Sequence, residues 1–248
     1  MARSVTTIAW RSFGASVIGP GHVSTGKPNQ DSWASFHHPW GDGVVVSDGL
    51  GSKQHSDWGS AAACRAVETA AYALSHDTLG DGPVAANLIA RVRDEWLRAI
   101  EPLDPRDSAA TCVFAVADGQ DQLHLGLLGD GAVVAVLTDG SVAALTDDKS
   151  GGFSNITSAL SPTVAAESWQ VTSLPAIDCV AVVLFTDGIS DDLEDLAGFA
   201  QELIKSFAAM PALAASRRIR EVLMTWPVPK HSDDKTLACL IREVRADG

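Results

Sequence analysis

Three apolar runs in this chain each end in an Asp-Gly turn, and this repeated pattern constrains the fold more than any other feature. The three runs and their turns are Val44–Val46 before Asp48-Gly49, Leu123–Leu128 before Gly129-Asp130-Gly131, and Val180–Phe185 before Asp187-Gly188. A single Asp-Gly pair is a common turn signal. Three buried strands that each end in an aspartate predict carboxylates brought together from distant parts of the chain.

These carboxylates need a partner, because crowded carboxylates repel one another unless they share protons or hold cations. Asp31 and the segment Ser232-Asp233-Asp234 add further acidic groups. Hard divalent cations take oxygen ligands. The sequence therefore predicts a divalent metal site built from residues far apart in the chain.

Length, charge and cysteine spacing restrict the domain organisation, the binding partners and the location that the sequence predicts. The 248 residues fit one domain, which we expect to span 1–248. A net charge of −13 without a basic block disfavours binding to nucleic acid or to an anionic membrane surface. No apolar run approaches the roughly 20 residues of a membrane span. The widely spaced Cys64, Cys112, Cys179 and Cys239 contain no Cys-x-x-Cys pair, which indicates buried reduced thiols and a cytoplasmic protein.

The order of elements predicts an α+β fold. We expect strands over 8–18 and 33–36, separated by a polar loop over 21–32, and helices over 57–74 and 81–100 that cover one sheet face. Strands over 108–117, 123–128 and 132–137 read as a meander of successive hairpins, with a turn at 138–141. Consecutive hairpins argue against a Rossmann-type fold.

The last third of the chain is expected to begin with an irregular segment over 146–171, a candidate for a recognition flap. Strands over 171–174 and 178–186 follow, then helices over 191–207 and 213–224, and a final strand over 236–241. No repeat or linker divides the chain.

In this order the motifs resemble the metal-dependent serine/threonine protein phosphatases of type 2C. The motifs that carry the resemblance are Asn29-Gln30-Asp31, Ser47-Asp48-Gly49-Leu50-Gly51, Ser108–Thr111, Gly129-Asp130-Gly131, Thr186–Asp191 and Asp233–Thr236. A bacterial subgroup with a Gly-His-x-x-x-Gly opening followed by Gln-Asp is the most similar. The resemblance implies a four-layer αββα sandwich, two antiparallel sheets flanked by helices.

The resemblance also implies the site residues. Asp48 would bridge two Mg²⁺ or Mn²⁺ ions, the Gly49 carbonyl would bind one of them, and Asp187 and Asp233 would complete the first ion's protein ligands. Asp130 and Asp191 match positions linked to a third, weaker ion. Asp31 matches an aspartate that holds metal-bound water.

Several positions depart from the family pattern. Gln30 stands where a glutamate ligand is usual, so the second ion would bind with one less charge. The phosphate-clamping arginine expected upstream of Asn29 is absent, and His22 or Lys27 would supply positive charge instead. A histidine common after the Asp-Gly turn is Leu50 here, and Asp234 replaces a usual asparagine.

The implied reaction is hydrolysis of a phosphomonoester by a water that bridges two metal ions. No nucleophile motif of the Gly-x-Ser-x-Gly, Cys-x₅-Arg or Walker type competes with it. Candidates for the acid that protonates the leaving oxygen are His22, His55 and a metal-bound water. The implied partners are a phosphorylated protein substrate and a cognate Ser/Thr kinase, and a monomer is expected.

Two alternatives remain open on sequence grounds. The first is a catalytically weak phosphatase-like module that binds a phosphorylated partner, which Gln30 and the missing arginine support. The second is a structural Ca²⁺-binding protein, which is disfavoured because the aspartates do not have the spacing of a twelve-residue EF-hand loop.

Overall fold

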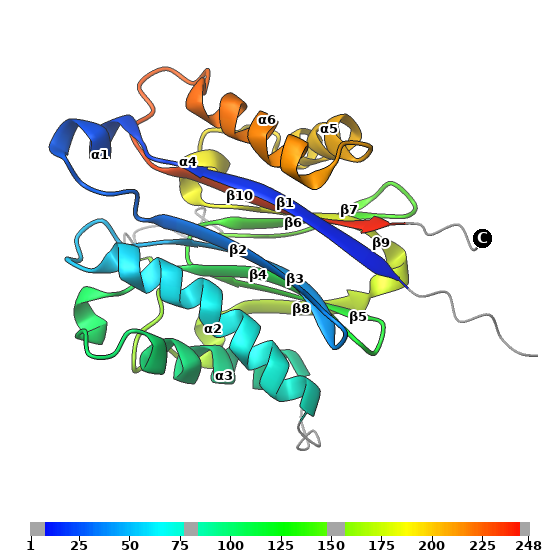
Figure 1. The fold of residues 1–248 in the computed structure, drawn as a ribbon, viewed down its shortest axis with the longest axis horizontal. Coiled ribbons are helices and arrows are strands. Elements are labelled where there is room, and N and C mark those ends of the chain that lie inside the picture. Colours follow the sequence, from blue (N-terminus) through cyan, green and yellow to red (C-terminus); the bar gives the residue numbers. More distant parts are fainter. Residues whose placement is uncertain (1–7, 77–83, 148–156, 244–248) are drawn as a thin grey trace, which may run out of the picture.

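The computed structural model describes residues 8–76, 84–147 and 157–243, which form four layers (Figure 1). Two five-stranded antiparallel sheets lie face to face in the middle, and a pair of helices covers the outer face of each sheet. The predicted α+β sandwich of two antiparallel sheets flanked by helices is therefore confirmed.

The first sheet contains both terminal strands. Its order is β1 (Ala9–Val17), β10 (Lys235–Glu243), β9 (Cys179–Phe185), β6 (Ala132–Leu137) and β7 (Val142–Thr146). The helices α5 (Leu196–Phe207) and α6 (Ala212–Met224) cover its outer face. Buried side chains such as Phe13, Phe185 and Ile219 fill this outer layer.

The second sheet has the order β2 (Asp31–His38), β3 (Gly41–Asp48), β4 (Cys112–Asp118), β5 (Gln122–Leu128) and β8 (Gln170–Pro175). The helices α2 (Ser56–His76) and α3 (Val84–Ala99) cover it, as the sequence predicted for this helix pair. The beginning of the predicted second helix, at 81–83, lies outside the described residues.

The alternation of side chains along β3 determines where its last residue points. Val45 packs against α2 and α3, whereas Val44 and Val46 pack between the two sheets. Successive side chains of a strand point to opposite faces. Asp48 therefore lies on the same face as Val46, at the end of the layer between the sheets.

The predicted meander over 108–137 is only partly correct. The hairpin between β4 and β5 exists, but β5 pairs with β4 and β8, while β6 pairs with β7 and β9 in the other sheet. The turn Gly129–Gly131 is thus a crossover between sheets and not a hairpin. This crossover places Asp130 at the seam where the sheets meet.

Three further predictions about local structure are wrong. The segment 21–32, expected as a loop, contains the short helix α1 (Pro20–Thr25). The third Asp-Gly turn is the first turn of α4 (Asp187–Ser190), and the following helix starts at Leu196 and not at Asp191. The strand β7 was not predicted. Of the segment expected to be irregular, residues 148–156 lie outside the described part of the chain.

All four cysteines are buried and unpaired, as expected. In the ranges that the structure describes, no helix is both long enough and apolar enough to cross a membrane.

Candidate metal centre

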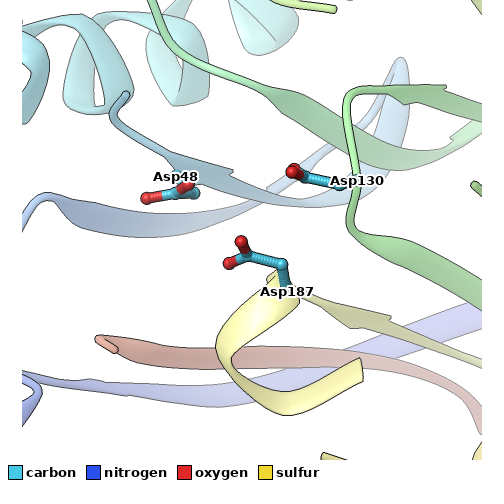
Figure 2. Close-up of side chains that lie close together, drawn as sticks. All are labelled: Asp48, Asp130 and Asp187. Carbon is cyan, nitrogen blue, oxygen red and sulfur yellow. The ribbon is translucent and has the colours of Figure 1, made fainter. Parts of the chain in front are cut away.

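Three aspartates from three separate segments point toward a common space (Figure 2). Asp48 ends β3, Asp130 lies in the β5–β6 crossover, and Asp187 begins α4. One carboxylate oxygen from each residue lies within 4.8 Å of the others. Each of the three Asp-Gly turns noted in the sequence thus contributes one carboxylate to the same cluster.

Close packing of backbone holds Asp187 in place. A Cβ atom on Gly188 would lie 1.9 Å from the carbonyl oxygen of Asp234, so only glycine fits there. The backbone N–H of Gly188 donates to Asp187 Oδ1 at 2.7 Å. The start of α4 is therefore fixed directly against the loop that carries Asp233.

Asp31 is a fourth member of this acidic group. It is the cross-strand partner of Asp48 in the β2–β3 pair, and its Oδ2 accepts a hydrogen bond from Thr186 Oγ1 at 2.8 Å. Burial raises the pKa of Asp31 to about 7. The hydroxyl of Thr186 orients this carboxylate, a contact that no sequence motif revealed.

Burial and neighbouring negative charges act on Asp48 and Asp187. Burial, followed by the charges of Asp31 and Asp187, raises the pKa of Asp48 well above its ordinary value. Burial and the charges of Asp130 and Asp233 raise the pKa of Asp187 to about 7. A bound cation would reverse these shifts, because it stabilises the ionised carboxylates.

Oxygen atoms without hydrogen-bond partners mark the same place. Gln30 Oε1, Asp31 Oδ1 and Asp130 Oδ1 are buried and accept no hydrogen bond. Buried acceptors of this kind are costly unless a ligand satisfies them. An all-oxygen set with several carboxylates matches the preference of Mg²⁺ and Mn²⁺, so the residues present fit the metal ions that the sequence predicted.

The side chain of Gln30 has a defined orientation. Its Nε2 donates to Ser56 Oγ at 2.6 Å, and Ser56 in turn donates to the carbonyl of Lys53. Ser56 is therefore the acceptor of the first bond, which assigns Oε1 as the unpartnered atom. Gln30 presents a neutral oxygen where the family pattern has a carboxylate.

The other predicted metal ligands lie around this cluster. Asp233 is not one of the three residues within 4.8 Å, but its charge acts on both Asp48 and Asp187. Asp191 is exposed and lines, together with Asp130, a hollow of about 480 Å³. The N–H of Gly49 donates to the carbonyl of Gln30 at 3.1 Å, which joins the ends of β2 and β3.

The predicted cationic residues are held by contacts of their own. Lys27 is exposed, and its Nζ donates to the carbonyl of Gly51 at 3.0 Å. The Nδ1 of His22 lies 2.8 Å from Asp234 Oδ2. Sequence reasoning noted Asp234 as an acidic residue that replaces an asparagine, and its contact with His22 was not anticipated. His55 is partly buried and its backbone N–H donates to Asp107.

Similarity to known proteins agrees with this geometry. The family model described as protein phosphatase 2C matches residues 18–224. Serine/threonine-protein phosphatase 3 of Escherichia coli (strain K12) is 29% identical over 196 residues, which cover 73% of this chain and 74% of that protein. The two-sheet fold and its acidic centre define a phosphatase of the metal-dependent class, and the chain belongs to the protein phosphatase 2C family.

Solved structures share the fold at low sequence identity. The catalytic domain of the serine threonine protein phosphatase PstP, in complex with two manganese ions, is 20% identical with a TM-score of 0.61, and the match covers 95% of this chain and 99% of that one. RsbX in complex with magnesium is 15% identical with a TM-score of 0.61, covering 96% and 99%. The resemblance inferred from the sequence motifs is confirmed.

Proposed function

We propose that this chain hydrolyses phosphoserine and phosphothreonine in a protein substrate, with Mg²⁺ or Mn²⁺ as cofactor. The observation that carries the proposal is the convergence of Asp48, Asp130 and Asp187 within 4.8 Å, beside buried oxygens that lack partners. Membership of the 2C family supports the same activity. None of the findings favours the catalytically weak binding module.

The residues divide into ligands and orienting groups. We assign Asp48, the Gly49 carbonyl, Asp187 and Asp233 to the principal metal ions, Gln30 to the second ion, and Asp130 and Asp191 to a third. Asp31, oriented by Thr186, would hold the attacking water by a hydrogen bond. When bound, the ions would supply positive charge that favours ionisation of water and offsets the charge of the phosphoryl oxygens. His22 and Lys27 would add positive charge from the α1 segment.

Removal of single carboxylates tests the proposal. Asp48→Asn and Asp187→Asn should each lower kcat/KM for a phosphothreonine peptide by about 100-fold or more at a fixed Mn²⁺ concentration, because each weakens a metal site. Neither change opens a cavity, so circular dichroism should be unchanged. Asp94→Asn, on the exposed face of α3, removes the same charge far from the cluster and serves as the matched control. Control-like rates in both variants would contradict the proposal.

The proposed function extends to the domain organisation, the partner kinase, the location and the oligomeric state of the chain. We propose that residues 1–248 form one catalytic domain, that a Ser/Thr kinase acts on the same substrate, and that the chain works as a cytoplasmic monomer. The match of the family model across 18–224 supports the single domain. Four buried, unpaired cysteines support a reducing compartment. Size-exclusion chromatography with light scattering tests the oligomeric state.

A further inference from the structure

Asp234 is a buried carboxylate at the junction of three segments. Its Oδ1 accepts a hydrogen bond from the backbone N–H of Gly19 at 2.6 Å, and its Oδ2 accepts one from the backbone N–H of Gln30 at 2.7 Å. The Nδ1 atom of His22 lies 2.8 Å from the same Oδ2. The side chain of Asp234 is 1% exposed, and that of His22 is 18% exposed.

These contacts determine which ring nitrogen of His22 carries a proton. Backbone N–H groups only donate, so both oxygens of Asp234 act as hydrogen-bond acceptors. Nδ1 of His22 must therefore be the donor in the contact with Oδ2. The hydrogen bond made by one ring nitrogen sets the role of the other, which leaves Nε2 as the atom available to a ligand.

The segments that carry His22 and Asp234 pack closely against the loop of the candidate metal ligand Asp233. A Cβ on Gly19 would lie 2.2 Å from the carbonyl carbon of Asp233, and the N–H of Gly21 donates to the carbonyl of Ser232 at 2.9 Å. The helix α1 therefore packs directly on the loop that carries Asp233, at the same end of the sandwich as α4 (Figure 1). The Asp234 oxygen that contacts His22 also accepts from the backbone N–H of Gln30, the residue next to Asp31, so the His22–Asp234 pair lies beside the acidic group.

The sequence leaves a specific role for this histidine. No arginine occurs between Arg11 and Arg65, so no guanidinium from this stretch is available to hold a phosphoryl group. Lys27 is exposed and donates to Gly51. A protonated imidazole held at Nδ1 presents a single directed donor, Nε2–H, with positive charge that matches an anionic oxygen.

We infer that Asp234 is a positioning residue that holds His22 with Nδ1 protonated, so that Nε2 contacts the phosphoryl group of the substrate. The inference deepens the proposed phosphatase function and rests on it for the identity of the ligand. In this chain the Asp234 carboxylate, which replaces the asparagine of the family pattern, and the histidine of α1 work as one unit.

Nitrogen NMR of the protein labelled with ¹⁵N-histidine tests the pair without any assay of activity. Comparison of wild type with His22→Gln assigns the His22 signals. We expect the wild-type protein to carry a proton on Nδ1, the nitrogen that faces Asp234 Oδ2 at 2.8 Å. A neutral ring protonated at Nε2, the opposite tautomer, would overturn the inference even if the protein is an active phosphatase.

A double-mutant cycle tests the contact with substrate. His22→Gln and Asp234→Asn should each lower kcat/KM for a phosphothreonine peptide by about tenfold at saturating Mn²⁺, a typical cost for loss of a partner that orients a functional histidine. The double variant should lose about tenfold and not a hundredfold, because the two residues act on the same contact. Independent, multiplying losses would overturn the inference, as would wild-type rates in His22→Gln.

Two controls separate the possible failures. Mn²⁺ affinity measured by calorimetry should match wild type in His22→Gln, since the histidine is not a metal ligand. If Asp234→Asn does not fold, His22→Gln and the NMR tautomer decide the matter. If wild-type protein hydrolyses no phosphopeptide, the proposed function fails, while the tautomer still reports on the pair.

Discussion

Gly188→Ala tests the geometry of the site alone, because it changes no metal ligand and no charge. The new methyl group would lie 1.9 Å from the carbonyl oxygen of Asp234 and 3.3 Å from Cβ of Asp233. An ordinary contact is about 3.5 Å, so α4 and the 233–234 segment must separate by roughly 1.5 Å. That movement pulls Asp187 away from Asp233, the two carboxylates on either side of this contact.

A displacement of about 1 Å at a catalytic centre can cost about 100-fold in rate. We therefore expect Gly188→Ala to lower kcat/KM by about 100-fold and to weaken Mn²⁺ binding. Overpacking should also reduce the free energy of unfolding by about 1–3 kcal/mol. Peptide dephosphorylation, Mn²⁺ calorimetry and urea denaturation measure these three effects.

Gly119→Ala provides the matched control for the same substitution. Its Cβ would lie 3.5 Å from the carbonyl of Trp40, which is an ordinary contact, in the β4–β5 turn. This variant should keep wild-type activity. If Gly188→Ala retains activity within about threefold of Gly119→Ala, the contact between α4 and the 233–234 segment does not position the metal ligands, and the geometric reasoning is wrong.

Three further outcomes are expected. Gln30→Glu places a charge at the unpartnered Oε1, so the Mn²⁺ concentration for half-maximal rate should fall about tenfold; an unchanged requirement would remove Gln30 from the metal site. Mn²⁺ at about 100 times its dissociation constant should stabilise the fold by about 2.7 kcal/mol and raise Tm by about 5–10 °C. EDTA should reverse this shift in Tm. A Tm that responds to neither Mn²⁺ nor EDTA would contradict metal binding to the folded state. Asp118→Asn should cost about 1–2 kcal/mol at neutral pH in urea denaturation, because Asp118 accepts from Gln120, Gln122 and His124. Burial alone would raise the pKa of Asp118, but these hydrogen bonds outweigh burial and lower it. A carboxyl whose pKa is lower in the folded state than in the unfolded state stabilises the fold at pH values above its unfolded pKa of about 3.9. This contribution is lost as the pH falls through the folded-state pKa. The difference between wild type and Asp118→Asn should therefore shrink below pH ~4; a constant difference would refute the assignment.

The sequence was sufficient to predict most of the longer strands and helices and the three aspartates that converge. The apolar runs before Asp48 and Asp187 are strands, and the helix pair after Asp48 covers one sheet. Such predictions succeed because burial imposes a hydrophobic pattern that local sequence displays. The convergence of Asp48, Asp130 and Asp187 also followed from that pattern, since each aspartate ends or follows a buried strand.

Local sequence could not predict which strands pair with one another. Nearly every residue of β5 is buried, and most of β6 is too, so neither shows the alternation that would reveal its partner. A short connection such as Gly129–Gly131 suits a hairpin equally well as a crossover between sheets. The crossover was therefore missed, although it is what brings Asp130 to the centre.

Short elements stabilised by tertiary contacts were missed for a related reason. The helix α1 has six residues, begins at Pro20 directly after Gly19 and buries none of its residues, so no periodic signal exists. Its position depends on hydrogen bonds from Gly19 to Asp234 and from Gly21 to Ser232, more than 200 residues away in the chain. The role of Asp234 is visible only when those segments are folded together.

Anomalous diffraction from crystals soaked in Mn²⁺ tests the central claim most directly. The account predicts manganese peaks between the carboxylates of Asp48 and Asp187, and loss of these peaks in Asp48→Asn. Crystals at saturating Mn²⁺ with no anomalous peak at this cluster would contradict it.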